Sequence, residues 1–592
     1  MAEEYIDVTI DGQKLSVAKG TKILEACQKI GINVPTLCHL KDVSSHGSCG
    51  ICVVEVKGAR RLVRSCMYTV LPNMEITTNN ERIRKSRKLN LELLLANHPL
   101  DCLTCERNLN CELQKLAQDL GVRETRFQRT KKRLLPLDVS SSSLVRDPNK
   151  CILCNRCVEV CSQMQTVHAI DIVGRGLSSK VSTFMDKGLG NVVCTNCGQC
   201  SLVCPTGAIT EKSQTQQVFD LLSDPDLVTI VQTAPAIRVG IGEAMGMEEG
   251  ALVTKQMVAG LRRLGFSKVF DTQFAADLTI MEEGYELIHR IKEGGVLPMI
   301  TSCSPGWIKF IEHFYPEQLP HLSTCKSPQQ MFGAIAKTYY AQLANIDPRK
   351  IRVVSIMPCT AKKYEAGRNE MDGAFSFWKE KLSLSEDERF CDVDIALTTR
   401  ELAKMFKQIG LDFSHLPLED FDDPLGNSTG AAVIFGATGG VMEAALRTAY
   451  EVLTEKTLED VNFEVVRGMD GIKEATIDIN GTSVRVAVAH TLKNARILLD
   501  QIKAGTSPYA FIEVMTCPGG CLGGGGQPIP STAEIREKRA ASIYEEDINL
   551  KIRKSHENPD IQTLYAQFLL NPLGEKSHHL LHTTYTKRNA YA

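Results

Sequence analysis

Residues 151–161 read CILCNRCVEVC, and residues 194–205 read CTNCGQCSLVCP. Both segments space their cysteines as C-x2-C-x2-C-x3-C, so the chain carries an internal repeat of closely spaced thiols. Groups of four cysteine thiolates are the usual ligands of iron–sulfur clusters. A structural zinc site takes only one set of four ligands, and it does not need two runs with this spacing. The repeat therefore predicts two 4Fe–4S clusters in one small domain, residues 138–212.

The repeat resembles the two-cluster ferredoxins of bacteria, in which the fourth cysteine of each run binds the other cluster. This resemblance implies crossed ligand sets. The first set is Cys151, Cys154, Cys157 and Cys204, and the second is Cys194, Cys197, Cys200 and Cys161.

Residues 1–80 predict a domain with a third cluster. Residues 5–20 alternate as strand, turn and strand around Asp11-Gly12, and an apolar helix and a cysteine loop follow. This order resembles the β-grasp fold of plant-type ferredoxins, which implies a 2Fe–2S cluster. The spacing C-x10-C-x2-C-x13-C is more similar to the electron-input modules of respiratory complexes and hydrogenases. The implied ligands are Cys38, Cys49, Cys52 and Cys66.

Residues 81–137 predict a small helical domain. A helix-forming segment from residue 81 ends at His98-Pro99, and the spacing that follows is H-x3-C-x2-C-x5-C. One imidazole and three thiolates would hold another 4Fe–4S cluster, with His98, Cys102, Cys105 and Cys111 as ligands. The alternative for His98 is a surface or capping role, but its position directly after a 2Fe–2S module favours a ligand.

Residues 213–592 predict a large α/β domain, so the whole chain is a multidomain α/β and α+β protein. Strand-like runs alternate with helical patterns, and three runs end at cysteine-bearing loops. The runs are LVTIVQTA, VLPMITSC, IRVVSIMPC, AAVIFGATGG and YAFIEVMTC. Gly436–Gly440 follows one run, but this loop lacks the lysine of a phosphate-binding loop and the full dinucleotide pattern. We therefore do not expect a nucleotide there.

The three cysteine-bearing loops read TSCSPGW (301–307), MPCTAKKYE (357–365) and EVMTCPGGCLGG (513–524). They resemble the three signature motifs of iron-only (FeFe) hydrogenases, and the chain as a whole is similar to the long clostridial type. The resemblance implies an H-cluster, which is a 4Fe–4S cubane joined to a two-iron unit with CO, cyanide and azadithiolate ligands. It implies Cys359, Cys517 and Cys521 as cubane ligands.

The first loop departs from the usual family pattern, because Ser304 stands where a second cysteine is common. Three interpretations remain open. Ser304 binds iron through oxygen, Cys303 moves to bind iron and gives up its proton-donor role, or one cubane corner has no protein ligand. We favour an oxygen ligand.

The resemblance also implies the surroundings of the two-iron unit and a proton path. Lys362 would hydrogen-bond a cyanide, and the lining residues would be Pro235, Gln329, Met357 and Met515. The path would use Cys303, Glu283, Ser323 and Glu286. The two glutamates are three residues apart in a predicted helix, so they share a face. The alternative for this pair is a solvated acidic surface.

The predicted activity is reversible conversion of two protons and two electrons to H2, with electrons relayed through one 2Fe–2S and three accessory 4Fe–4S clusters. The expected partners are ferredoxin, flavin- and NAD(P)-binding iron–sulfur subunits of an electron-bifurcating complex, and maturation proteins. Two alternatives are a non-turnover hydrogen sensor or iron–sulfur scaffold and a complex-I-like electron-transfer subunit. The second alternative lacks the three loops.

Composition sets the remaining limits. The net charge of the 592-residue chain is −2, so no basic excess indicates nucleic-acid binding. No segment is long and apolar enough to predict a membrane span, and the polar start predicts no export signal. The 22 cysteines favour metal binding in a reducing compartment over disulfides. We expect a cytoplasmic protein of an anaerobic organism.

Overall fold

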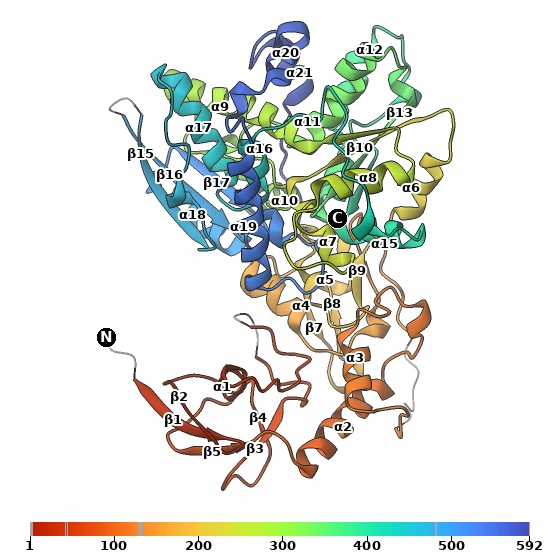
Figure 1. The fold of residues 1–592 in the computed structure, drawn as a ribbon, viewed down its shortest axis with the longest axis vertical. Helices are drawn as coiled ribbons and strands as arrows, with labels where there is room; N and C mark the ends of the chain where they lie inside the picture. The colour runs from red at the N-terminus through yellow and green to blue at the C-terminus, as the bar shows by residue number, and fades with distance from the viewer. Residues whose placement is uncertain (1–3, 42, 44, 128–133, 480–481, 591–592) are drawn as a thin grey trace.

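The computed structural model describes residues 4–590 except 42, 44, 128–133 and 480–481. The chain runs along the long axis of the molecule, from the N-terminal modules at one end to the large α/β domain at the other (Figure 1). The repeat domain of residues 138–212 lies between them. Within the described ranges, no helix is both long and apolar enough to cross a membrane.

The N-terminal domain is a five-stranded sheet with one helix packed on it. The strand order is β2-β1-β5-β3-β4, with β1 parallel to β5 and antiparallel to β2. Asp11 and Gly12 form the predicted turn, and both have positive φ angles. The elements are β1 (Tyr5–Ile10), β2 (Gln13–Ala18), α1 (Ile23–Lys29), β3 (Val53–Val56), β4 (Val63–Arg64) and β5 (Met74–Thr77).

The second module is helical, as predicted. The side chain of Asn80 accepts a hydrogen bond from the backbone of Ile83 and so caps α2 (Glu81–Ala96). This helix ends just before His98. The remaining elements are η1 (Cys102–Thr104) and α3 (Glu112–Asp119).

The repeat domain shows internal symmetry at the level of the backbone. Asn155 and Gly198, which follow the second cysteine of each run, both have left-handed backbone angles. A short helix begins after each of them, α4 (Arg156–Glu159) and α5 (Gln199–Val203). Two antiparallel strand pairs complete the domain, β6 (Leu144–Arg146) with β9 (Ile209–Glu211) and β7 (Asp171–Val173) with β8 (Lys180–Ser182).

The large domain contains two four-stranded sheets. The first is parallel throughout, in the order β11-β10-β13-β14. Its strands are β10 (Val228–Thr233), β11 (Lys268–Asp271), β13 (Ile351–Met357) and β14 (Ile395–Thr398). The second has the order β12-β17-β16-β15, in which only β15 is antiparallel to its neighbour. Its strands are β12 (Met299–Ile300), β15 (Ile472–Ile479), β16 (Thr482–His490) and β17 (Phe511–Met515).

A long buried helix, α9 (Thr272–Glu293), packs against helices on both of its sides. These neighbours are α11 (Pro328–Ile335) and α17 (Gly440–Thr454). Helix α9 carries both glutamates of the predicted proton path, and its Asp271 N-cap side chain accepts a hydrogen bond from the backbone of Gln273.

The strand predicted for AAVIF (431–435) is wrong. This segment forms α16 (Gly430–Val433) and the short helix η13 (Ile434–Gly436), and α17 follows it. All five residues are apolar and buried, so the segment has no polar face. A short apolar run of this kind has no period that separates a buried strand from a buried helix.

Candidate functional site

The largest concentration of predicted site residues lies at the carboxyl ends of four parallel strands, two from each sheet. Strands β10 and β13 of the first sheet and β12 and β17 of the second end at the loops that line one cavity. Carboxyl ends of parallel strands are the usual place for ligand sites in α/β folds. The cavity therefore depends on both sheets.

Every residue predicted for the cofactor and its pocket lines this cavity. These residues are Pro235, Cys303, Ser304, Gln329, Met357, Cys359, Lys362, Met515, Cys517 and Cys521. Further residues line it that were not among the predicted site residues, and they include Thr272, Ala276, Phe435 and Thr516. Thr272 and Ala276 come from the first turns of α9, and no motif marks them.

Two glycines allow the cysteine loops to approach each other and the repeat domain. A Cβ atom on Gly524 would lie 2.1 Å from the carbonyl oxygen of Pro358, the residue before Cys359. A Cβ atom on Gly525 would lie 2.3 Å from the carbonyl oxygen of Cys197. Since such distances are too short for a side chain, glycine is required at both positions.

The thiols in the cavity form a donor set suited to iron. Burial raises the pKa of Cys521 to about 12 and raises the pKa of Cys517 and Cys359. A thiol in such surroundings keeps its proton until a metal ion replaces it. Soft thiolates from two loops on one cavity therefore fit an iron–sulfur cubane.

Lys362 and Glu365 form a buried pair at the cavity wall. The ammonium group of Lys362 donates to Glu365 Oε2 at 2.8 Å, to Ser327 Oγ at 2.8 Å and to the carbonyl oxygen of Cys303 at 3.2 Å. Gln329 Nε2 also donates to Glu365 Oε2, at 3.0 Å, while Gln329 Oε1 is buried without a partner among the described residues. A fixed cation and an amide thus face the cavity.

Ser304 lies at the start of α10 (Pro305–Phe314) and shares a hydrogen bond with Thr516. The two hydroxyl oxygens are 2.8 Å apart, and the backbone N–H of Thr516 lies 3.3 Å from Ser304 Oγ. Since Thr516 directly precedes Cys517, this contact ties the first loop to the third.

The predicted proton path is assembled as a group. Burial raises the pKa of Cys303 well above its usual value, and the charge of Glu283 adds to this shift. Burial raises the pKa of Glu283 to about 8, with the charge of Glu286 as the next cause. The carboxylate oxygens of Glu283 are buried and make no hydrogen bond among the described residues.

Glu286 lies one helical turn after Glu283, and its carboxylate accepts several hydrogen bonds. Ser323 Oγ donates to Glu286 Oε2 at 3.0 Å, as the predicted relay requires. Arg290 donates twice to the other oxygen, at 2.6 and 3.1 Å, and the Thr324 backbone N–H and hydroxyl also bond this carboxylate. Sequence reasoning missed Arg290 and Thr324. The spacing of Arg290, four residues after Glu286, was the available signal.

The cysteines of the repeat domain gather in the two crossed sets expected from the sequence. One cavity is lined by Cys151, Cys154, Cys157 and Cys204, and a second by Cys161, Cys194, Cys197 and Cys200. Burial raises the pKa of one thiol in each set, Cys154 and Cys197, to about 12.

The second of these cavities lies directly against the cysteine-bearing loops of the large domain. Thr360, next to Cys359, donates its hydroxyl to the carbonyl oxygen of Asn196 at 2.7 Å. Gln199 Nε2 donates to the carbonyl oxygen of Gly523 at 2.8 Å. Two residues therefore lie between Cys197 and Cys359 along the first contact, and three lie between Cys200 and Cys521 along the second.

The two N-terminal cysteine sets lie near the first repeat cavity. In the 2Fe–2S module, the thiols of Cys52 and Cys66 are 3.3 Å apart, and Cys38 and Cys49 share a hydrophobic cluster with Cys154.

The His98 set meets the same cavity from another side. Cys111 Sγ lies 3.5 Å from the carbonyl oxygen of Pro205, and Arg107 donates to that of Cys204 at 3.4 Å. Burial lowers the pKa of His98, which keeps its imidazole neutral and able to bind metal.

The glycine loop 436–440 has an internal partner. Glu513 Oε1 accepts from the backbone N–H of Gly439, and Oε2 from that of Met442, both at 2.7 Å. These N–H groups belong to the start of α17, where a carboxylate is favoured. The loop thus holds the strand that leads to Cys517.

Comparison with protein families covers nearly the whole chain. Residues 228–525 match the family "Iron only hydrogenase large subunit, C-terminal domain", and residues 533–588 match "Iron hydrogenase small subunit". Residues 3–81 match a 2Fe–2S iron–sulfur cluster binding domain. Residues 87–126 and 142–210 match an iron–sulfur binding region and a ferredoxin-like domain of NADH–quinone oxidoreductases.

Individual relatives point the same way. The chain is 50% identical to the NADP-reducing hydrogenase subunit HndD of Solidesulfovibrio fructosivorans, over 98% of this chain and 99% of the relative. It is 38% identical to iron hydrogenase 1 of Clostridium pasteurianum, over 98% and 100%. A solved apo variant of the FeFe-hydrogenase HydA1 from Chlamydomonas reinhardtii is 44% identical and superposes with a TM-score of 0.56, over 64% of this chain and 100% of that one.

Proposed function

The chain belongs to the iron-only hydrogenases, and from this premise we propose which of its residues bind iron, carry protons and pass electrons. Its activity is that of the family, an oxidoreductase acting on hydrogen with electrons relayed through iron–sulfur clusters. The observation that carries the residue assignment is the convergence of three cysteine-bearing loops and Lys362 on one cavity.

Cys359, Cys517 and Cys521 are the proposed protein ligands of the H-cluster cubane. When bound, the H-cluster supplies the redox chemistry that interconverts H2 with protons and electrons. The protein supplies buried thiols, the Lys362 ammonium group for anionic ligands and a lining of Pro235, Met357 and Met515. This apolar lining excludes water and strengthens the electrostatic effect of Lys362.

We propose Ser304 as the fourth ligand, through its hydroxyl oxygen. Its hydrogen bond with Thr516 would orient that oxygen, as groups around a metal site commonly do. Replacing one thiolate with oxygen changes the potential of an iron–sulfur cluster.

Three variants test this ligand. Ser304→Cys should shift the cubane potential measured by redox titration, and Ser304→Ala should lower iron content, while Thr516→Val should retain iron. Equal iron content and potential in wild type and Ser304→Ala would contradict the ligand assignment.

The proposed proton path runs from Cys303 through Glu283 and Ser323 to Glu286. Cys303 holds its proton because burial disfavours the thiolate. Glu283, with a pKa raised to about 8, can gain and lose a proton near neutral pH. Ser323 donates to Glu286, and Glu286, which also accepts from Arg290, ends the proposed path.

The proposed electron path begins at two input modules. The 2Fe–2S cysteines and the His98 set both lie against the Cys151/Cys154/Cys157/Cys204 cavity, and the other repeat cavity lies against the catalytic loops. This order gives three accessory 4Fe–4S clusters and one 2Fe–2S cluster.

We propose an NAD(P)-linked electron partner. Two observations support it: the full-length similarity to a subunit of an NADP-reducing hydrogenase and the NADH–quinone oxidoreductase-like modules. Ferredoxin would be a further electron partner of the same input modules.

The first test is hydrogen production from reduced viologen by the anaerobically purified full chain, after insertion of the two-iron unit. Turnover is the expected result, and the natural electron partner would then be the next property to determine. If CO and cyanide infrared bands were present without turnover, the chain would be a sensor or scaffold.

A further inference from the structure

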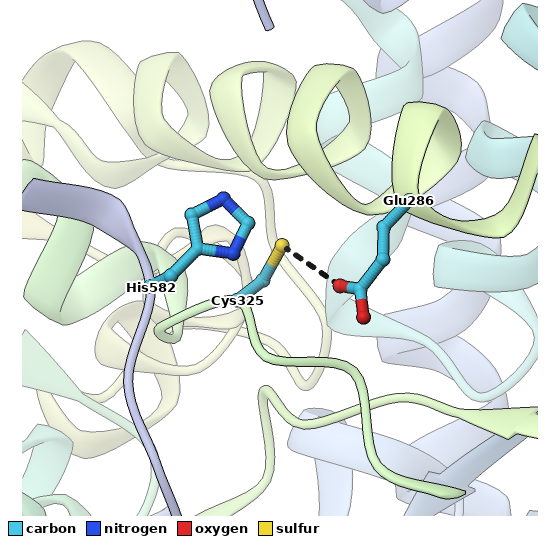
Figure 2. A group of neighbouring side chains, drawn as sticks. All are labelled: Glu286, Cys325 and His582. Carbon is cyan, nitrogen blue, oxygen red and sulfur yellow. Dashed lines mark hydrogen bonds between the residues drawn. The ribbon is translucent and has the colours of Figure 1, made fainter. Parts of the chain in front are cut away.

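The C-terminal segment approaches the proton path at Glu286. His582 directly follows α21 (Glu575–Leu581), and its ring faces Cys325 and Glu286 (Figure 2). Thr324 joins these residues by hydrogen bonds. Its Oγ1 lies 3.2 Å from Glu286 Oε2 and 2.7 Å from His582 Nδ1. A continuous hydrogen-bonded chain thus leads from the end of the proposed proton path to a histidine in the C-terminal segment.

The second ring nitrogen of His582 also has a partner. His582 Nε2 lies 3.1 Å from Glu282 Oε2, and this oxygen accepts a further bond from the backbone N–H of Leu573 at 2.9 Å. Tyr565 donates its hydroxyl to the other oxygen of Glu282. His582 is therefore fixed between two buried carboxyl groups, one on each side of its ring.

We propose that Thr324 and His582 form a second proton exit from Glu286, in addition to the exit at its Arg290-bound edge. This inference rests on the proposed function, because it extends the proton path of the same active site. The species that passes through this exit is a proton, so the test needs no other ligand.

The exit works through two arrangements of the same hydrogen bonds. In the first, Glu286 carries the proton and donates to Thr324, which donates to a neutral His582 Nδ1. In the second, Thr324 donates to ionised Glu286, and His582 donates from Nδ1 as an imidazolium. The shift moves one proton from Glu286 to His582 without moving a heavy atom. In both arrangements His582 Nε2–H donates to Glu282 Oε2, and in the last step the N–H bond breaks and this oxygen takes the proton, which leaves His582 neutral with its proton on Nδ1.

A route from His582 to solvent lies on the same helix. The rings of His578 and His582 have centroids 4.4 Å apart, and His578 is exposed. Histidine is the side chain whose ordinary pKa suits proton exchange near neutral pH. The exposed imidazole of His578 would therefore exchange protons between His582 and water.

Several charged or titratable groups face His582. They are Glu282 and Glu286 of α9, Arg290 through Glu286, Cys325, His578 and Tyr565 through Glu282.

The trio Glu286, Cys325 and His582 also has the composition of a metal site, with ligand atoms within 4.8 Å of one another. Thr324 already occupies the hydrogen-bonding positions between Glu286 and His582, and Arg290 neutralises Glu286. The contacts of these groups are complete as a hydrogen-bonded network, which favours proton transfer over metal binding.

The test compares two matched substitutions in the full chain with all clusters installed. Thr324→Val removes the linking hydroxyl, whereas Thr324→Ser keeps it. His582→Gln keeps hydrogen-bonding atoms but cannot pass a proton between two ring nitrogens, and His582→Ala leaves space for added imidazole. Hydrogen production and oxidation are measured from pH 5 to 9 in H2O and D2O, and bound iron and CO/cyanide infrared bands are measured in parallel.

The expected result is a loss of about three- to tenfold in turnover for Thr324→Val and His582→Gln, the smaller end of general acid–base effects because the first exit remains. Both variants should show a larger solvent isotope effect and an altered pH profile, Thr324→Ser should match wild type, and imidazole should raise the rate of His582→Ala.

Two results would overturn the proposal. The first is wild-type rates and pH profiles in both Thr324→Val and His582→Gln. The second is equal loss in Thr324→Val and Thr324→Ser, or a loss in His582→Ala that imidazole does not relieve, since either would show a structural role. An inactive wild type with intact infrared bands would instead contradict the proposed function.

Discussion

The two halves of this molecule collect their cysteines in different ways. In residues 1–212 each predicted cluster draws most of its ligands from one short run, as in Cys151–Cys161. In residues 213–592 the cavity takes Cys359 from one sheet and Cys517 and Cys521 from the other. Electron transfer needs only clusters held close together, whereas the catalytic site also needs a cation, a proton donor and an apolar wall. That larger set comes together only where two sheets meet.

The largest expected effect tests the catalytic half. Cys521→Ala should reduce hydrogen turnover to background and remove the CO and cyanide infrared bands, because this thiol is one of the three proposed cysteine ligands of the H-cluster cubane. Cys391→Ala, an exposed thiol of the same domain, is the matched control and should behave like wild type. Turnover retained in Cys521→Ala would break the comparison, since the cavity would then not be the active site.

The next effect tests whether the catalytic half adds proton transfer to electron transfer. Glu283→Gln should lower turnover about 100-fold, as loss of a positioned acid–base group typically does. Wild-type activity should change around pH 8, where Glu283 titrates, and the variant should lose that inflection. Glu293→Gln, on the exposed end of the same helix, is the control. A pH profile that is the same in Glu283→Gln and wild type would exclude Glu283 from the path.

A smaller effect is expected from substitutions in the electron-transfer half, residues 1–212. Cys204→Ala should disturb the cluster of Cys151, Cys154 and Cys157, and Cys161→Ala should disturb the other one, because the structure groups the thiols in crossed sets. Electron paramagnetic resonance of the reduced protein distinguishes the two clusters. Turnover with reduced viologen should fall about two- to fivefold in either variant, a range set by the tuning that ligand changes exert on cluster potential. If each substitution disturbed the cluster of its own run, the crossed sets would be wrong.

The smallest effect concerns stability. The native pKa of Glu283 is raised to about 8 from an ordinary value of 4.5. The folded protein therefore holds this proton more tightly than the unfolded chain, and stability declines as pH rises from about 4.5 to 8. Glu283→Gln lacks this dependence. Its melting temperature relative to wild type should rise across that interval, measured by calorimetry under argon, and a constant difference would contradict the raised pKa.

Local patterns were enough to predict much of the fold. The turn at Asp11-Gly12, the helix that ends before His98 and the strands β10, β13 and β17 agree with the sequence-based expectations. The strand expected at AAVIF is a helix, because burial on all sides erased its period. Strands β15 and β16 and the pairing of two separate sheets were not anticipated, since pairing depends on residues far apart in the chain.

The residues of the candidate site were likewise predicted from the sequence only in part. Spacing indicated the runs of cysteines, and resemblance supplied the crossed ligand sets, the three cubane cysteines, Lys362, Glu283 and Glu286. The tertiary structure added Thr272, Ala276 and Thr516 to the cavity and brought Arg290, Thr324 and His582 to Glu286. His582 lies 296 positions after Glu286, and no pattern within either segment refers to the other.

The sequence by itself determined the number and kind of ligand groups, because thiolate spacing within a run is a local property of the chain. Only the tertiary structure decided which groups share a cavity and how buried they are. Burial raises the pKa of Glu283, whose oxygens have no hydrogen-bond partner among the described residues, to about 8, whereas the Glu286 carboxylate, one turn away on the same helix, accepts hydrogen bonds from Arg290 and Ser323. The physical reason is that desolvation and hydrogen bonding depend on what surrounds a side chain, and those surroundings come from distant segments of the chain.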